Sequence, residues 1–160
     1  MKRGTIIEAF KLINGIKMNV VSDKATRSAV ISNHLMMYKI AQENDEEVKK
    51  IYEKLFEGKE EDMKKVAELR QDFMNATTNE ERGAIVNELN DNYKHIFELE
   101  AEFNKTFAER NEEEVAINIA KFDREAFVNA CADSGVEFTM STILRLEEIF
   151  KDEDGEETKE

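Results

Sequence analysis

The sequence predicts a mainly α-helical protein of the α+β class. We expect a long antiparallel helical hairpin, extra short helices and a small β cap of two or three strands. Three observations carry this prediction. The 160 residues include no proline and only six glycines, the two residue types that interrupt helices. Two long stretches repeat apolar residues at steps of three and four. Residues 115–120 alternate instead with the period of a strand.

A short helix is expected near the start of the chain. Thr5 and Glu8 have the spacing of a capping box, in which each side chain bonds to the other residue's backbone amide. The helix should end at Gly15, because glycine readily adopts the left-handed turn that closes a helix. After a short extended connector, Ser22 or Asp23 is expected to cap the next helix.

Residues 23–57 and 79–110 are predicted to form two long helices that pack antiparallel through facing apolar stripes. Gly58 should end the first helix, and Thr78 with Glu81 forms a capping box that should open the second. A shorter helix between them is expected to fill the turn. The apolar residues of the first stripe are Ile31, Leu35, Tyr38, Ala41, Val48, Ile51, Tyr52 and Leu55, and those of the second are Ile85, Leu89, Tyr93, Ile96, Leu99, Phe103 and Phe107.

The predicted cap follows the hairpin. Residues 115–120 should form a strand with Val115, Ile117 and Ile119 on its buried face. A strand needs a partner for its backbone polar groups, and the available candidates are residues 136–138 and the connector 17–21.

Two helices complete the predicted cap. Asp123 should cap the first, which should end at Gly135, and Thr139 or Ser141 should cap the second. We expect one domain over 1–150, with 151–160 as a disordered acidic tail.

The charge of the chain limits the classes of partner. A net charge of −13 repels the phosphate backbone, so nucleic acid is not an expected ligand. Residues 1–27 are locally basic, at +4, and we interpret them as a contact within the fold rather than as a binding site. Cys131 is the only cysteine, which fits a reducing compartment. The first residues resemble neither a signal peptide nor a membrane span, so a soluble intracellular protein is expected.

The residue types that carry chemistry point away from an enzyme. The sequence contains no glycine-rich phosphate loop, and its acidic runs lack the calcium-loop pattern. His34 and His95 flank apolar helical positions, where histidine is usually a boundary residue, and neither follows a carboxylate by three residues as in di-iron helical sites. Cys131 lies on an apolar helix face, where it should be a small buried side chain. We therefore expect no catalytic residues, no metal and no cofactor.

The order of segments resembles that of small uncharacterised proteins encoded in tailed-phage and prophage genomes. The stretches "EEVAINI", Glu113 to Ile119, and "STILRL", Ser141 to Leu146, carry the resemblance best, and residues 58–78 are an extra element beyond it. The resemblance implies a helical hairpin followed by a short strand and a terminal helix. It also implies a role in the cytoplasm of a bacterial host, with association with the virion as a second option, and it assigns no catalytic residues.

These observations favour a non-enzymatic interaction or assembly factor encoded by a phage or prophage. An acidic mimic of DNA that inhibits a nucleic-acid enzyme is the alternative, and an enzyme with unrecognised residues is a third hypothesis. The expected partner is another protein, either a second copy in a homo-oligomer or a phage or host component, and not a nucleic acid or a membrane. Met37, Phe56 and Phe97 lie just off the predicted stripes and are the candidate docking residues.

Overall fold

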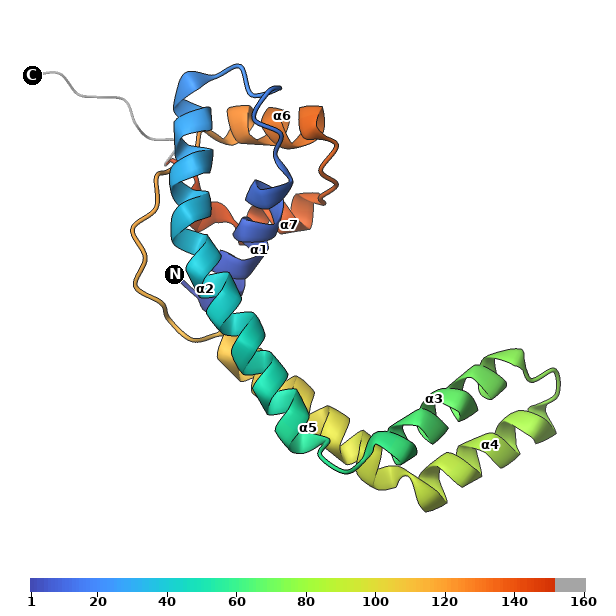
Figure 1. Ribbon diagram of the computed structural model, residues 1–160. Helices are drawn as coiled ribbons and strands as arrows, with labels where there is room; N and C mark the ends of the chain where they lie inside the picture. The colour runs from blue at the N-terminus through green and yellow to red at the C-terminus, as the bar shows by residue number, and fades with distance from the viewer. Residues whose placement is uncertain (152–160) are drawn as a thin grey trace, which may run out of the picture. The chain divides into compact units, whose positions relative to one another are not determined.

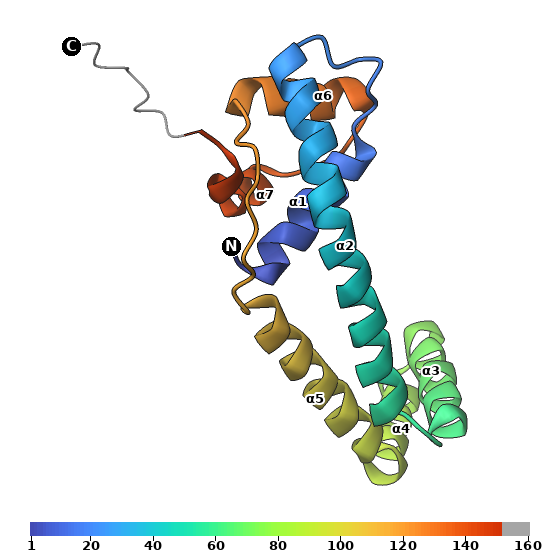
Figure 2. The same ribbon diagram turned by 60° about the vertical axis from the view of Figure 1, so that its left-hand side comes forward.

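The computed structural model describes residues 1–151 and is mainly helical (Figures 1 and 2). The chain groups into two compact units. Unit 1 comprises Met1–Asp45 and the described residues from Arg110 onward, and unit 2 comprises Glu46–Glu109. The described elements are α1 (Arg3–Gly15), α2 (Lys24–Leu55), α3 (Glu60–Asn75), α4 (Asn79–Asn92), α5 (Lys94–Asn111), α6 (Arg124–Ser134), α7 (Met140–Arg145) and the 3₁₀ helix η1 (Glu147–Ile149).

Helix α1 begins two residues before the predicted cap, so the prediction of a Thr5–Glu8 capping box is wrong. Its N-cap residue, Lys2, makes no side-chain capping bond. Instead the Arg3 amide donates to the Glu113 carbonyl at 2.8 Å. A backbone group from the second segment of unit 1 thereby satisfies an amide that the helix itself leaves without a partner. The helix ends at Gly15 as predicted, but without the expected left-handed turn, because Gly15 is its last helical residue and the capping residue Ile16 is extended, with a φ of −73°.

Helix α2 begins where the sequence predicts. The Asp23 carboxylate accepts from the Thr26 amide at 2.6 Å. This hydrogen bond favours the charged form of the carboxylate and lowers the pKa of Asp23. Asp23, rather than Ser22, is therefore the capping residue.

The buried face of α2 within unit 1 is not the predicted one. Ile31, Leu35 and Tyr38 are exposed, whereas the buried side chains include the polar Asn33 and Asn44. The buried residues of this helix are Thr26, Ala29, Val30, Asn33, Met37, Ala41 and Asn44. The prediction failed because Asn33 and Asn44 read as surface positions, while the fold supplies each with a hydrogen-bond partner.

Residues 115–120 do not form a strand, and the described residues contain only isolated β-bridges. The buried carboxamide of Asn33 takes the place of a neighbouring strand. Its Nδ2 donates to the Ala120 carbonyl at 2.8 Å, and its Oδ1 accepts from the Ala120 amide at 2.8 Å. The predicted inward alternation is retained, because Val115, Ile117 and Ile119 are half-buried against the core and Asn118 is exposed.

Two isolated β-bridges provide hydrogen-bond partners for backbone groups at the two ends of this extended segment. Near its start the Val115 amide donates to the Met1 carbonyl at 2.9 Å. Beyond its end, the Phe122 amide donates to the Ile149 carbonyl and the Lys151 amide donates to the Phe122 carbonyl, each at 2.9 Å. Residues 136–138 and 17–21 are also not strands, so the predicted β cap is wrong.

The two helices that follow begin as predicted and α6 ends at the predicted Gly135, whereas α7 is shorter than the sequence predicts, because it ends at Arg145 and Glu147–Ile149 form the 3₁₀ helix η1. The Asp123 carboxylate accepts from the Ala126 amide at 2.8 Å, and Gly135 closes α6 with a φ of 74°. The Thr139 hydroxyl accepts from the Thr142 amide at 3.2 Å and caps α7, so Thr139 rather than Ser141 is the capping residue.

The core of unit 1 is formed by side chains of α1, α2 and α6 together with those of residues 143–150. It contains three fully buried phenylalanine rings, of which Phe127 lies 4.7 Å from Phe122 and 5.6 Å from Phe150 between ring centroids. Such tilted and edge-on pairs favour aromatic packing beyond the burial of area. The other fully buried large side chains of this core are Ile6, Ile13, Met37, Leu146 and Ile149.

Unit 2 contains the helical hairpin of α3 and α4. The predicted Thr78–Glu81 capping box is confirmed, with the Glu81 amide 3.2 Å from the Thr78 hydroxyl and the Thr78 amide 3.1 Å from the Glu81 carboxylate. The predicted single helix over 79–110 is wrong, because it breaks at Tyr93, with φ −125° and ψ 14°. The break lets α4 pair with α3, while the Phe103 ring of α5 meets the Tyr52 ring at 5.6 Å.

Unit 2 has a thin core. Only three hydrophobic side chains are buried among its described residues, namely Phe56, Val66 and Ile96. A unit with so few buried side chains leaves much of its apolar surface in contact with water. None of the helices described is both long and apolar enough to cross a membrane.

We predict that replacing Asn33 with Ala lowers the free energy of unfolding by about 2–4 kcal/mol, because both backbone groups of Ala120 lose their partner. Urea unfolding measures the change, and Ser32→Ala, at the neighbouring exposed position of the same helix, is the control. Equal stability of the two variants would contradict the proposed role of the carboxamide.

A second prediction concerns the close approach of α1 to the end of α6. A Cβ atom at Gly15 would lie 2.7 Å from a Val136 methyl, so Gly15→Ala should destabilise the protein by about 1–3 kcal/mol. Adding Val136→Ala should recover part of this loss. Gly83→Ala, in an open helical position, should instead stabilise by about 0.5–1 kcal/mol, and thermal unfolding of all four proteins tests the set.

Candidate functional site

The two histidines lie at partly buried positions in different units, as the sequence predicts. His34 Nε2 is 3.1 Å from the Asn14 carboxamide oxygen, and its ring forms a cluster with those of Phe10 and Tyr38, each pair of centroids 5.3–6.1 Å apart. His95 Nε2 is 2.8 Å from a carboxylate oxygen of Asp62, which joins α5 to α3. Neither histidine faces a hydroxyl or thiol that it could activate through a described contact.

The Asp62–His95 pair lines a shallow cavity of about 530 Å³ in unit 2. The remaining lining residues are Lys59, Glu98, Leu99 and Glu102. This lining supplies an imidazole and charged groups, but no serine, threonine or cysteine that the imidazole could activate. Throughout residues 1–151, no group of three or more histidine, cysteine, aspartate or glutamate side chains is arranged to hold a metal ion.

Cys131 is fully buried in unit 1, on the apolar face of α6, as predicted. Burial raises the pKa of its thiol to about 12, because the thiolate would lose its hydration. A thiol in this state is a small apolar side chain at neutral pH, and it is not an activated nucleophile.

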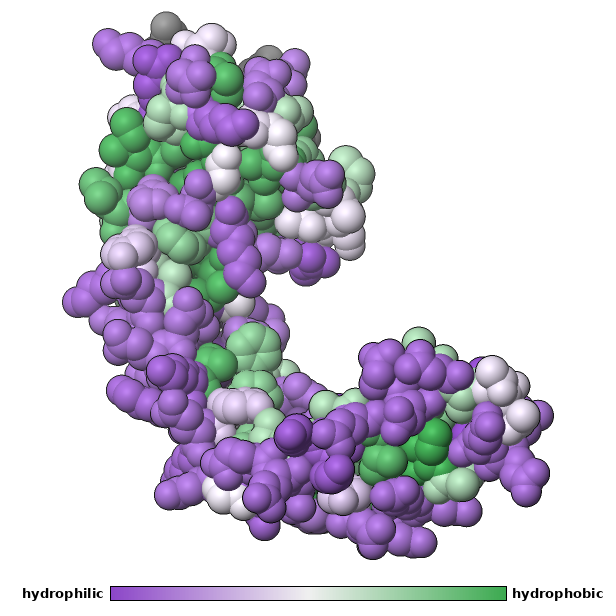
Figure 3. Space-filling view, turned by 45° about the vertical axis from the view of Figure 1, so that its right-hand side comes forward, coloured by the Kyte–Doolittle hydropathy of each residue, from purple (hydrophilic) through white to green (hydrophobic). Residues whose placement is uncertain are grey.

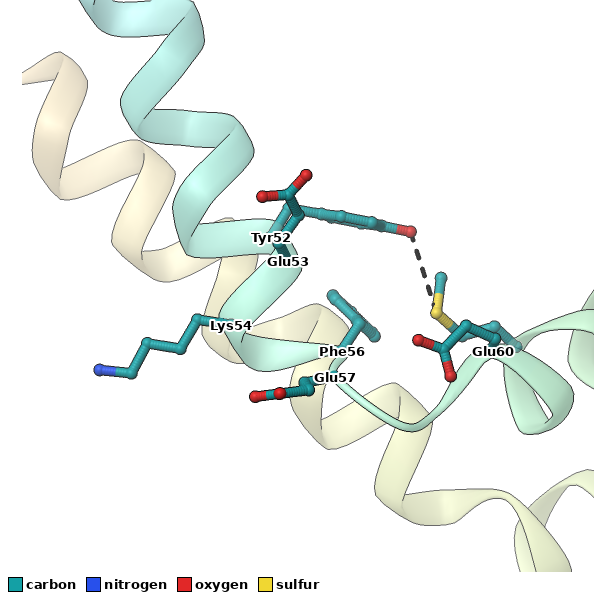
Figure 4. A pocket seen from close by; sticks show the side chains of 7 residues that line it. Tyr52, Glu53, Lys54, Phe56, Glu57 and Glu60 are labelled. Atoms are coloured by element: carbon teal, nitrogen blue, oxygen red, sulfur yellow. Dashed lines mark hydrogen bonds between the residues drawn. The ribbon is translucent and has the colours of Figure 1, made fainter.

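Unit 2 also contains a groove of about 640 Å³ where α2 ends and α3 begins (Figure 4). Its apolar part consists of Tyr52, Phe56 and Met63. The Tyr52 hydroxyl donates to the Met63 sulfur at 3.9 Å, and the Tyr52 ring lies 4.7 Å from that of Phe56. These contacts hold the three side chains together on one side of the chain.

The rim of this groove is acidic. Glu53, Glu57 and Glu60 line it together with a single base, Lys54. Figure 4 shows the Lys54 side chain directed away from Tyr52 and Glu60. The groove therefore combines an aromatic and thioether floor with three carboxylates, which suits a cationic side chain with an apolar stem.

A second apolar surface of unit 2 lies along the α3–α4 hairpin. Phe73, Met74 and Val86 remain exposed there, and apolar side chains are visible between the two helices in the space-filling view (Figure 3). The Arg82 guanidinium lies 5.9 Å from the centroid of the Phe73 ring. Arg82 thus covers part of the apolar surface that the α3–α4 hairpin leaves exposed.

Two of the three predicted docking residues are buried within the chain. Met37 is 0 % exposed in unit 1 and Phe56 is 5 % exposed in unit 2, so the expectation that they lie beside the buried stripes is wrong. Phe97 is half-buried, with the Arg70 guanidinium 5.1 Å from its ring centroid. Arg70 is held there by Glu100, at 3.0 and 2.7 Å from its two terminal nitrogens. A docking role for these residues stays a prediction.

The sequence reasoning missed the residues that shape the groove and the exposed face of α2. The sequence predicts Tyr52 in a buried stripe, and nothing in its pattern predicts a groove where this helix ends. The signal that pointed to the groove was Gly58, which turns the chain with a φ of 71° and brings Met63 back beside Tyr52.

Comparison with known proteins adds no relative: no family model, curated protein or solved structure matches this chain.

We predict that Cys131 reacts with a thiol-specific disulfide reagent at neutral pH only when the protein unfolds. Its pKa in the folded state is raised above the unfolded value of 9.0, so this group favours the folded state below pH 9 and loses that effect as pH rises toward 12. Reaction rates in buffer and in urea check the first point. Rapid modification of the folded protein would contradict the burial of the thiol.

Proposed function

We propose that this protein is a non-enzymatic interaction or assembly factor that binds a basic segment of another protein. The observation that carries the proposal is the groove at Tyr52, Phe56 and Met63 with its three glutamates. An arginine or lysine side chain satisfies both parts of this groove, because its stem packs on apolar surface while its charge meets the carboxylates.

The charge distribution supports a basic partner. Unit 2 contains 17 acidic and ten basic side chains, a net charge of −7. The described residues of unit 1 are close to neutral, with 13 acidic and 12 basic side chains. Unit 2, which contains the groove, therefore carries −7 of the chain's net charge of −13, and salt should weaken its attraction for a cationic segment.

The thin core of unit 2 supports binding as its role. With three buried hydrophobic side chains, this unit gains stability whenever a partner covers Phe73, Met74 or Val86. A partner that binds the folded unit would raise its apparent stability by mass action. The resemblance to phage and prophage proteins suggests a partner in the cytoplasm of a bacterial host or in the virion.

A mimic of DNA is the second candidate, and the net charge of unit 2 is the observation that favours it. Such a mimic would bind a DNA-binding enzyme in competition with the duplex. It would depend on carboxylates along the whole surface rather than on the apolar floor of one groove. Tyr52→Ala should therefore abolish binding by the groove and leave the binding of a DNA mimic largely unchanged.

We predict that replacing Glu53, Glu57 and Glu60 together with Gln weakens binding of a basic partner by about tenfold or more. Affinity capture from a bacterial host identifies the partner, and titration against arrayed peptides with arginine or lysine beside leucine maps its segment.

The matched control for this experiment removes the same number of charges from unit 2 outside the groove. Replacing Glu88, Asp91 and Glu102 with their amides does so. If the control variant loses as much affinity as the groove variant, the groove is not the site, and a diffuse electrostatic mode such as DNA mimicry is favoured.

A further inference from the structure

Helix α2 presents an unpartnered apolar stripe on the surface of unit 1. Ile31, Leu35 and Tyr38 follow one another at steps of four and three, and they are 50 %, 71 % and 45 % exposed. The buried side of the same helix is already occupied by Val30, Met37 and their neighbours. The stripe is therefore a second face that no described residue of unit 1 covers.

Aromatic rings extend this stripe toward α1. The Tyr38 ring stacks on that of His34 at 6.1 Å, with the planes 19° apart, and the Phe10 ring lies 5.3 Å from that of His34. The contact of His34 with Asn14 fixes the orientation of the imidazole. A partner thus meets a surface whose rings are already held in place, which lowers the entropy cost of binding.

Charges on the same side of the helix are arranged with opposite signs at its two ends. At 100° per residue, Lys24 and Arg27 share the exposed side with Ile31, and Asp45 lies on it beyond Tyr38. The midpoint of α2 between Ile31 and Tyr38 is also the midpoint between Lys24 and Asp45. A copy of this helix turned end to end therefore presents apolar residues to apolar residues and base to acid.

We propose that two copies of this protein associate through antiparallel packing of their α2 helices about a two-fold axis near residues 34 and 35. Ile31 of each copy packs against Tyr38 of the other, and Lys24 of each copy meets Asp45 of the other. Leu35, the most exposed of the three apolar residues, lies at the centre of the interface, where binding energy concentrates.

The charge pattern favours a second copy over an unrelated partner. A surface with one sign of charge would call for a partner of the other sign, whereas this face has both signs in a self-complementary order. The described residues of unit 1 have a net charge of −1 and themselves repel a second copy only weakly, whereas residues 152–160 add −5. The proposal uses unit 1 alone and is independent of the groove in unit 2.

Leu35→Glu tests the stripe. Light scattering and sedimentation equilibrium should give a dimer of the 18.5 kDa wild-type chain at high micromolar concentration. The variant should raise the dimer dissociation constant by at least about tenfold with an unchanged circular dichroism spectrum, because Leu35 makes little contact within the chain. Leu144→Glu, at a comparably exposed site on α7, is the matched control and should remain dimeric.

Cysteine cross-linking tests the direction of the pairing. Copies with Ile31→Cys are mixed with copies with Tyr38→Cys and treated with a short bismaleimide, which leaves the buried Cys131 unmodified. The antiparallel arrangement predicts that cross-links between an Ile31→Cys copy and a Tyr38→Cys copy outnumber cross-links between two copies of the same variant. Preferred cross-links between two copies of the Ile31→Cys variant would overturn it.

Charge exchange tests the ends of the stripe. Lys24→Glu or Asp45→Lys alone should weaken the dimer, and the two together should restore it, because each pair is re-formed with its signs reversed. A monomeric wild type at high concentration, a dimer that is unaffected by Leu35→Glu, or equal loss in the Leu144→Glu control would overturn the proposal. Binding of basic peptides by unit 2 should be the same in all of these variants.

Discussion

The fold of unit 1 depends on one buried side chain, the carboxamide of Asn33. It supplies a donor and an acceptor to the backbone of Ala120, each at 2.8 Å, in a place where a neighbouring strand would otherwise be required. Residues 115–121 can therefore run as a single extended segment over the core. This path leads to Phe122, whose bridge to Phe150 brings the last described residues into the same core. A polar residue thus organises a largely apolar interior.

The sequence predicts most of the helix starts well because N-caps are local. Asp23, Thr78 with Glu81, Asp123 and Thr139 each act on an amide three residues away, so their spacing is sufficient. The Thr5–Glu8 pair has the same spacing and fails, since a carbonyl from residue 113 satisfies the helix start instead. The break at Tyr93 and the extended segment 115–121, which pairs with no neighbouring strand, also depend on contacts with residues distant in the sequence. The spacing of residues within one helix does not reveal such contacts.

The candidate sites were harder to predict for a related reason. Helix α2 has two faces with helical periodicity, and the one with Ile31, Leu35 and Tyr38 is the more apolar. The fold buries the other face because Asn33 finds Ala120 and Asn44 accepts from Arg110 at 3.0 Å. Met37 was therefore expected near the surface and lies in the core. The buried Cys131 and the two boundary histidines were predictable, because each depends only on the apolar residues around it in its own helix.

The division of the chain has a consequence for the order in which its parts fold during synthesis. Unit 1 is discontinuous, since Met1–Asp45 packs with residues that follow Arg110, and the whole of unit 2 is translated between these segments. Unit 2 is complete on the ribosome while Ile6, Ile13 and Met37 still lack Phe127 and Leu146. Closing this long loop is slow compared with forming a local hairpin. The nascent N-terminal helices thus expose apolar surface for most of translation, and chaperones that recognise such surface meet the N-terminal segment first.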